Sequence, residues 1–313
     1  MYTLYLETCG AGIGYISDIP LDNFFERISN LEVPGIKTSS IIPSNCSHFV
    51  YYKNNLKNTF YCDENNIYIN YDKDSITDSS IIRIGLVLLE KALGEKKKLI
   101  LHSACVSYND SAILLLGRSG SGKTSLALNL CDNYGYKLMS NDRTIIGIND
   151  ENKICCFEGT KYFTLRYSSI FKNCPKYLRY FEDSTIDPWL NKKVVSLEQI
   201  GIAAESRVLE VQKSFLLHID NDQELLYNMS GNNLTNRLFL NEFFQMGIRG
   251  MYSTFLDKDF NYIGYMPSLD NEELYSFRVQ MMNSLLQDDF LEYISGNLSD
   301  VSNYVFKKRK KDV

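Results

Sequence analysis

The sequence of 313 residues has no long apolar run, no net positive charge and no C-x-x-C pair of cysteines. A membrane-spanning helix needs about 18 or more consecutive apolar residues. The apolar runs here are far shorter, such as residues 112–116, so we expect no membrane partner. The N-terminal residues also lack the basic and long apolar segments of a signal peptide, so a cytoplasmic location is expected.

The charge balance and the cysteines argue against two further classes of function. The formal net charge is −5 and the isoelectric point is about 5.4, which argues against a nucleic-acid partner. The eight cysteines and three histidines are scattered, without the spacing of a zinc site. We therefore expect reduced thiols rather than a metal centre or a disulfide framework.

The hydrophobic pattern divides the sequence into three expected regions. Residues 1–95 alternate short apolar segments with polar turns, which predicts a small β-rich region. Residues 96–230 are expected to form a core with a mixed sheet. Residues 231–313 are expected to be mainly helical, because apolar residues recur at helical spacing in 271–286 and again in 289–305. Together these features predict an α/β fold.

The most informative segment, AILLLGRSGSGKTSLALNLC, begins at Ala112. An apolar run typical of a buried strand leads into the pattern G-x-x-x-x-G-K-[ST], and a helix is predicted to follow. Glycines let backbone N–H groups curl toward phosphate oxygens, and the helix N-terminus adds positive charge. The lysine can reach the outer phosphates, and the threonine hydroxyl suits Mg²⁺. The segment therefore predicts a nucleotide site formed by Gly117, Ser119, Gly120, Ser121, Gly122, Lys123, Thr124 and Ser125.

The residues before this loop predict its neighbour in the sheet. Leu99–Tyr108 is predicted to form a strand, and Asn109-Asp110 a turn that leads directly into the strand before the loop. Antiparallel pairing about that turn places His102 opposite about position 118, inside the loop. His102 is therefore a candidate site residue, although a structural role fits the pattern equally well.

The hairpin and three short motifs carry a resemblance to a known family. The motifs are His102-Ser103-Ala104, the loop GRSGSGKT, and KLMSNDRT at 137–144. With the hairpin, they resemble the HPr kinase/phosphorylase superfamily and its smaller bacterial relatives. The resemblance covers residues 98–148 and extends less clearly to about 225. It implies an HPr kinase-like P-loop core that uses ATP and Mg²⁺, a peptide or protein acceptor, and a possible homo-oligomer. The family's Glu-Ile-Arg-Gly signature is missing at the matching distance, so the phosphorylase reaction is not expected.

Asn141, Asp142 and Arg143 follow the next predicted strand, and ligands of open α/β sheets bind where strands end. Asp142 can there hold Mg²⁺ opposite Thr124. The resemblance implies two adjacent aspartates, one for the metal and one for the proton of the attacking hydroxyl. Asn141 replaces the first and Asp142 matches the second. An amide can orient a hydroxyl but cannot take a proton at neutral pH. Arg143 is a candidate to stabilise phosphate charge or to pair with Asp142.

The expected function is that of an ATP-dependent phosphotransferase that moves the terminal phosphate to a Ser or Thr hydroxyl. Asp142 or His102 would handle the proton in that reaction. Asn141 favours an alternative, a nucleotide-binding regulatory or scaffold subunit with degraded catalysis. A plain ATPase is the third possibility. The residues do not select the acceptor, or ATP over GTP.

Overall fold

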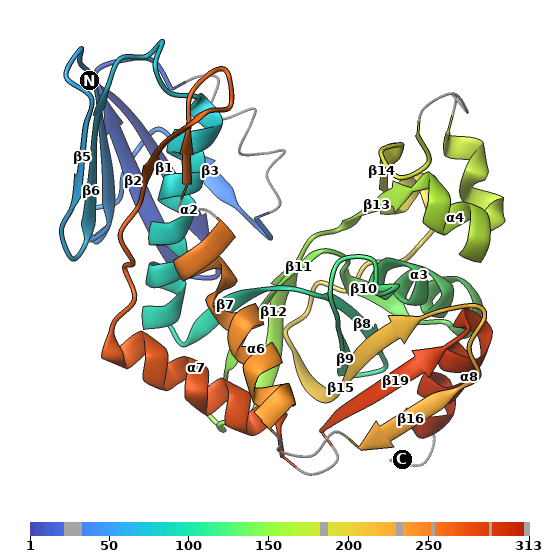
Figure 1. Cartoon of the computed structure of the whole chain (residues 1–313). Helices are drawn as coiled ribbons and strands as arrows, with labels where there is room; N and C mark the ends of the chain where they lie inside the picture. The colour runs from blue at the N-terminus through green and yellow to red at the C-terminus, as the bar shows by residue number, and fades with distance from the viewer. Residues whose placement is uncertain (22–32, 182–186, 230–233, 252–253, 288–289, 310–313) are drawn as a thin grey trace. The chain divides into compact units, whose positions relative to one another are not determined.

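The computed structural model describes residues 1–21, 33–181, 187–229, 234–251, 254–287 and 290–309 (Figure 1). The chain is a mixed α/β protein that divides into two compact units. The first unit consists of Met1–Ile100 and Phe239–Gln280, and the second of Leu101–Leu238 and Met281–Val313. The expected region 231–313 is thus shared between the two units. Among the described helices, none is both long and apolar enough to cross a membrane.

The first unit contains a six-stranded mixed sheet with the order β3-β1-β2-β4-β6-β5. Its strands are β1 (Tyr2–Thr8), β2 (Ala11–Ser17), β3 (Lys37–Ser39), β4 (Phe49–Asn54), β5 (Thr59–Cys62) and β6 (Asn66–Tyr71). The helix α2 (Asp78–Glu95) packs against β2, and its N-cap residue is Thr77, whose side chain accepts a hydrogen bond from the Ser80 backbone N–H. This cap satisfies one of the open N–H groups of the first turn. Within residues 1–95 the structure thus describes the six strands β1–β6 and the helix α2.

A segment from the C-terminal part of the chain completes the first unit. It contains most of α6 (Leu234–Met246), the π-helix Gly247–Met251, β17 (Thr254–Leu256), β18 (Tyr262–Tyr265) and the first part of α7 (Glu272–Leu285). β17 and β18 form an antiparallel pair. The Leu256 backbone N–H donates to Ser80 Oγ at 3.0 Å, which ties β17 to the start of α2.

The second unit is built on a nine-stranded sheet whose main path is β10-β8-β9-β15-β12-β11-β7, with β19 beside β15 and β16 beside β19. The strands are β7 (Lys98–His102), β8 (Ala104–Tyr108), β9 (Ser111–Leu116), β10 (Lys137–Ser140), β11 (Arg143–Ile148), β12 (Ile154–Gly159), β15 (Leu209–Ile219), β16 (Leu226–Met229) and β19 (Leu291–Gly296). A separate hairpin pairs β13 (Tyr162–Arg166) with β14 (Lys192–Ser196).

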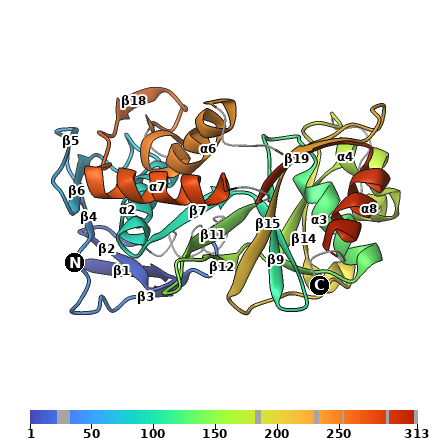
Figure 2. The same cartoon turned by 90° about the horizontal axis from the view of Figure 1, so that it is seen from below.

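The helices of the second unit are α3 (Lys123–Tyr134), α4 (Tyr167–Asn173), the 3₁₀ helix Pro175–Tyr180, α5 (Leu197–Ile200) and α8 (Leu298–Arg309). α3 and α8 contact each other, and Figures 1 and 2 both place them alongside one another. A hydrophobic core of this unit lies between these helices, the β13–β14 hairpin and the sheet, and includes Leu126, Phe163, Phe215 and Val301. Burial of these apolar side chains is the main favourable term that holds α3 on the sheet.

Four strands of this sheet end at the same edge. β10 is antiparallel to β8, and β8 is antiparallel to β9, so β10 runs parallel to β9. β15 is parallel to β9, and β19 is parallel to β15. The segments that follow β9, β10, β15 and β19 therefore meet at one edge, the position where ligands of α/β sheets usually bind.

One predicted helix is wrong in part. The segment 289–305 was predicted to be helical throughout, but Leu291–Gly296 forms β19 and only Leu298–Arg309 is helical. Residue 289 lies outside the described residues. Leu291 and Ile294 are buried because β19 pairs with both β15 and β16. A short apolar run that is buried on both faces has no periodicity that distinguishes a strand from a helix.

Candidate functional site

The loop Gly117–Thr124 connects the end of β9 to the start of α3. Gly120 and Gly122 have φ angles of 85° and 93°, a region that favours glycine. Nothing lies within 4 Å of a Cβ placed on Gly120, whereas a Cβ on Gly122 would lie 2.3 Å from Cγ1 of Ile219. The Ile219 backbone N–H also donates to the Ser121 carbonyl at 2.9 Å. The end of β15 therefore contacts the loop directly, through packing of Ile219 against Gly122 and through one backbone hydrogen bond.

Lys123 is buried at the start of α3 and turns back over the loop. Its Nζ donates to the Gly117 carbonyl at 2.6 Å and to the Arg118 carbonyl at 3.1 Å. Burial lowers the pKa of Lys123 to about 8, and the charge of Asp142 opposes that shift. The loop carbonyls therefore hold the ammonium group in place, and the group interacts electrostatically with the carboxylate of Asp142, which follows β10.

The first turn of α3 has features that favour a negatively charged ligand. Gly122 is the N-cap residue, and no side chain in the described part of the chain caps the helix. The hydroxyl of Ser121 is buried and has no hydrogen-bond partner among the described residues. Thr124 is half-buried, and Ser125 Oγ accepts a long hydrogen bond of 3.4 Å from Asn173. Open N–H groups and the helix dipole make such an N-terminus favourable for phosphate.

A tight turn follows β10 at Asn141-Asp142-Arg143, and Thr160 holds it. The Asp142 and Arg143 backbone N–H groups donate to Thr160 Oγ1 at 3.0 and 3.3 Å. The Asn141 N–H donates to the Thr160 carbonyl at 3.2 Å. Three backbone groups of one turn thus bond to a single residue that follows β12, which fixes the turn in one conformation.

The side chains of this turn have different environments. Asn141 is 2% exposed, and its Oδ1 has no partner within the described ranges. Asp142 is partly exposed, and its Oδ1 lies 3.2 Å from Nε2 of His102. Arg143 begins β11 and is half-buried. An unsatisfied buried carbonyl oxygen destabilises the folded protein by about 1–3 kcal/mol. A hydrogen-bond donor or a cation that bound to Asn141 Oδ1 would remove this penalty.

The strand pairing that positions His102 differs from the prediction. The predicted strand 99–108 is broken at Ser103, so that β7 pairs with β11 while β8 pairs with β9. The hairpin itself is confirmed, with Ala104 opposite Leu115. His102 therefore does not lie opposite position 118 in a ladder. The break turns β7 toward the segment after β10, where His102 meets Asp142.

One other predicted residue is less closely connected. Ser119 is exposed on the loop and makes no hydrogen bond with the other described residues of the site. Thr160 and Ile219 both contact the site although neither belongs to a recognisable motif. For Ile219 the signal was its place at the end of β15, one of the strands that end at the shared edge.

The chemistry of these residues suits a Mg²⁺ ion bound with a polyphosphate. The described residues contain no group of three or more His, Cys, Asp or Glu side chains that could hold a metal by themselves. Mg²⁺ does not need such a cage, since it usually takes one or two protein oxygens together with phosphates and water. Thr124 and Asp142 offer those oxygens, and the unsatisfied Asn141 Oδ1 is a further acceptor for a bound water.

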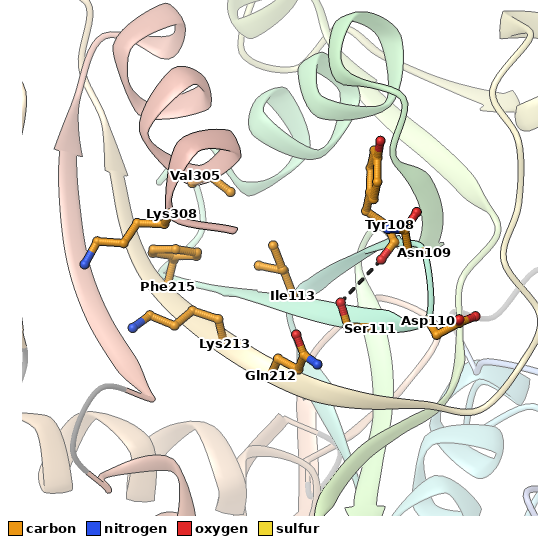
Figure 3. Close-up of a pocket in the computed structure, with 10 residues that line it drawn as sticks. All are labelled: Tyr108, Asn109, Asp110, Ser111, Ile113, Gln212, Lys213, Phe215, Val305 and Lys308. Atoms are coloured by element: carbon orange, nitrogen blue, oxygen red, sulfur yellow. Dashed lines mark hydrogen bonds between the residues drawn. The ribbon is translucent and has the colours of Figure 1, made fainter. Parts of the chain in front are cut away.

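A pocket at the opposite edge of the sheet contains none of the predicted site residues (Figure 3). It has a volume of about 220 Å³ and lies where β9 begins, with Ile113 and Phe215 among its lining residues. Lys213 and Lys308 also line it, but each ammonium lies 3.5 Å from Oε2 of the fully buried Glu292. Because this carboxylate already neutralises part of their charge, the pocket is a poor site for phosphate.

Comparison of the sequence with protein-family models and with curated proteins gives no match.

Proposed function

We propose that this protein is an ATP-dependent phosphotransferase that transfers the terminal phosphate to a hydroxyl group of a peptide or protein. The observation that carries the proposal is a pair of buried polar atoms without partners among the described residues, Ser121 Oγ and Asn141 Oδ1. Each lies in one of the two segments where a polyphosphate and its metal would bind. A ligand that bonds to both atoms would remove their desolvation cost, about 1–3 kcal/mol for each.

The loop residues would bind the phosphates. The open first turn of α3 and the ammonium of Lys123 supply fixed positive charge at one place, which is what transfer through a loose transition state requires. Thr124 and Asp142 would hold Mg²⁺, which neutralises phosphate charge when bound. Binding would draw Lys123 away from the carbonyls of Gly117 and Arg118.

The pair formed by His102 and Asp142 would handle the proton of the acceptor hydroxyl. Asn141 cannot take a proton, and Asp142 would be shared with the metal. His102 Nε2 lies 3.2 Å from Asp142 Oδ1, so the carboxylate can orient the ring toward the acceptor hydroxyl. In this proposal Asn141 orients the hydroxyl or a water, and His102 is the proton acceptor.

Transfer of labelled phosphate from ATP tests the proposal, with a library of Ser- and Thr-containing peptides as acceptors. We expect label in peptide, loss of the label with Lys123→Ala, and a fall of about 100-fold or more with His102→Ala if it is the proton acceptor. Asn141→Asp should retain or increase transfer. Peptide labelling that is unchanged in Lys123→Ala would contradict the proposal.

A nucleotide-binding regulatory subunit is the second candidate, and Asn141 is the observation that favours it. In this case Mg·ATP would bind with no transfer to any peptide and no release of phosphate, and Asn141→Asp would not change this. Release of free phosphate without an acceptor would identify a plain ATPase. Both outcomes would retain the nucleotide site and reject the phosphotransferase.

A further inference from the structure

A groove of about 400 Å³ lies in the second unit beside α3 and α4 and beside the segments that follow β15 and β19. Five of the nine described residues that line it are asparagines, and none is acidic. These asparagines are Asn129, Asn133, Asn173, Asn221 and Asn297. The volume is within the range of about 300–1,000 Å³ that is usual for small-molecule sites.

The amides form short chains of hydrogen bonds that leave acceptors open. Asn221 Nδ2 donates to Asn173 Oδ1 at 3.0 Å, and Asn133 Nδ2 donates to Asn129 Oδ1 at 2.6 Å. Among the described residues, the side-chain oxygens of Asn221 and Asn133 accept no hydrogen bond. Each free oxygen stands beside an N–H of the same amide, so the side chain can bind a ligand that presents a donor next to an acceptor.

The groove is connected to the start of α3. Asn173 Nδ2 donates to Ser125 Oγ at 3.4 Å, and Ser125 is the third residue of the helix that follows the loop. Asn221 lies two residues after Ile219, whose backbone bonds to the loop. The near end of the groove therefore borders the proposed phosphate site directly.

The order of the strands shows on which side of β9 the groove lies. β10, which carries Asp142 beyond its end, lies on one side of β9, and β15 and β19 lie on the other. Asp142 would hold the metal at the outer phosphates, so the phosphate chain must run from there across the loop. The end of the nucleotide that carries the base would then leave on the side of β15 and β19, where the groove is.

We propose that this groove binds the base of the nucleotide and selects adenine over guanine, an inference that depends on the proposed function. Adenine presents an N–H donor beside a ring-nitrogen acceptor, which matches the paired oxygen and N–H of one amide. An amide can also pair with O6 and N1–H of guanine, but it leaves the exocyclic N–H donors of guanine without an acceptor, which a carboxylate would supply, and the described lining contains no carboxylate. Asn221 reads the base edge, because its oxygen is open and it follows β15, the strand whose end bonds to the loop. Tyr134 and Leu298 provide apolar surface for the ring.

Calorimetric titration of the full chain with Mg·ATP, Mg·GTP and Mg·tripolyphosphate tests this inference. We expect wild-type protein to bind Mg·ATP about tenfold more tightly than Mg·GTP or Mg·tripolyphosphate. Asn221→Leu should weaken Mg·ATP binding about tenfold and leave Mg·tripolyphosphate unchanged. Asn221→Asp should shift the preference toward Mg·GTP, because a carboxylate accepts both guanine donors. Asn58→Leu, at an exposed asparagine of the first unit, is the matched control and should change nothing.

Equal affinity of the wild type for Mg·ATP and Mg·tripolyphosphate would overturn the inference and leave the proposed phosphate site intact. The same conclusion would follow if Asn221→Leu bound Mg·ATP as the wild type does. If none of the three ligands binds to the wild type, the proposed function itself fails. A loss of tripolyphosphate binding in Asn221→Leu would indicate damage to the loop and would also overturn the proposed role of Asn221 in base recognition.

Discussion

Replacement of Gly122 by alanine tests how the end of β15 and the phosphate loop depend on each other. Gly122 has φ of 93°, and an added Cβ would lie 2.3 Å from Cγ1 and 2.5 Å from Cβ of Ile219. Gly120 is a matched position, since its φ is 85° but nothing lies within 4 Å of its Cβ. The two substitutions therefore share the backbone strain and differ in the steric clash.

The magnitudes follow from these two terms. A non-glycine residue in the left-handed region costs about 1–2 kcal/mol. Gly120→Ala should therefore lower the free energy of unfolding of the second unit by about that amount. Gly122→Ala adds the cost of forcing a methyl group into a packed site, about 1–3 kcal/mol. We expect a total loss of about 2–5 kcal/mol for Gly122→Ala, a large part of the stability of a typical domain.

Urea denaturation measures the difference. Trp189 is the only tryptophan in the sequence and lies in the second unit, so its fluorescence reports the unfolding of that unit. The midpoint should fall for both variants and should fall further for Gly122→Ala, with similar slopes. Equal midpoints for the two variants would refute the packing of Ile219 against the loop. A smaller loss for Gly122→Ala than for Gly120→Ala would refute it as well.

Three further predictions concern the same unit. Burial lowers the pKa of Lys123 from 10.5 to about 8 in the folded protein. Between pH 8 and pH 10.5 the unfolded chain therefore binds more protons than the folded chain, so the free energy of unfolding rises with pH in this range. In urea titrations, Lys123→Met should raise the free energy of unfolding by about 3 kcal/mol at pH 7 and by little at pH 10. An increase of the same size at both pH values would contradict this prediction. Thr160→Val should cost about 1–3 kcal/mol in urea and lower peptide labelling, whereas Thr160→Ser should retain both. Hydrogen bonds from Arg207 lower the pKa of Glu205 from 4.5 to about 2. The ionised carboxylate therefore stabilises the folded protein above pH 4.5, and this contribution is lost as the pH falls toward 2. Glu205→Gln should therefore cost about 2 kcal/mol at neutral pH and nothing at pH 2 by thermal melting, and an equal loss at both would disprove it.

Local sequence patterns predicted the elements whose signal lies in adjacent residues. The turn at Asn109-Asp110, the strand Ser111–Leu116 and the helix after Gly122 all follow from short-range chemistry. The glycines of the loop also adopt the backbone conformations that only glycine accepts without strain. The position of Asp142 just beyond β10 was predicted for the same reason.

The errors arose where distant segments decide the structure. Nothing near Ser103 in the sequence indicates that the strand breaks there, because the partner of β7 is β11. β19 was mistaken for part of a helix because its burial depends on β15. The sharing of residues 231–313 between two units likewise has no local signal, since it depends on which surfaces the segments 239–280 and 281–309 cover.

The sequence by itself determined a glycine loop between a buried strand and a helix, with an amide and an acid after the next strand. These are properties of neighbouring residues, and backbone sterics and hydrogen bonding act over a few positions. Only the tertiary structure brought His102 to Asp142, placed Thr160 under the turn and lined a groove with asparagines from four separate segments. Such contacts depend on strand order and packing, because residues far apart in the chain meet only when the sheet has formed.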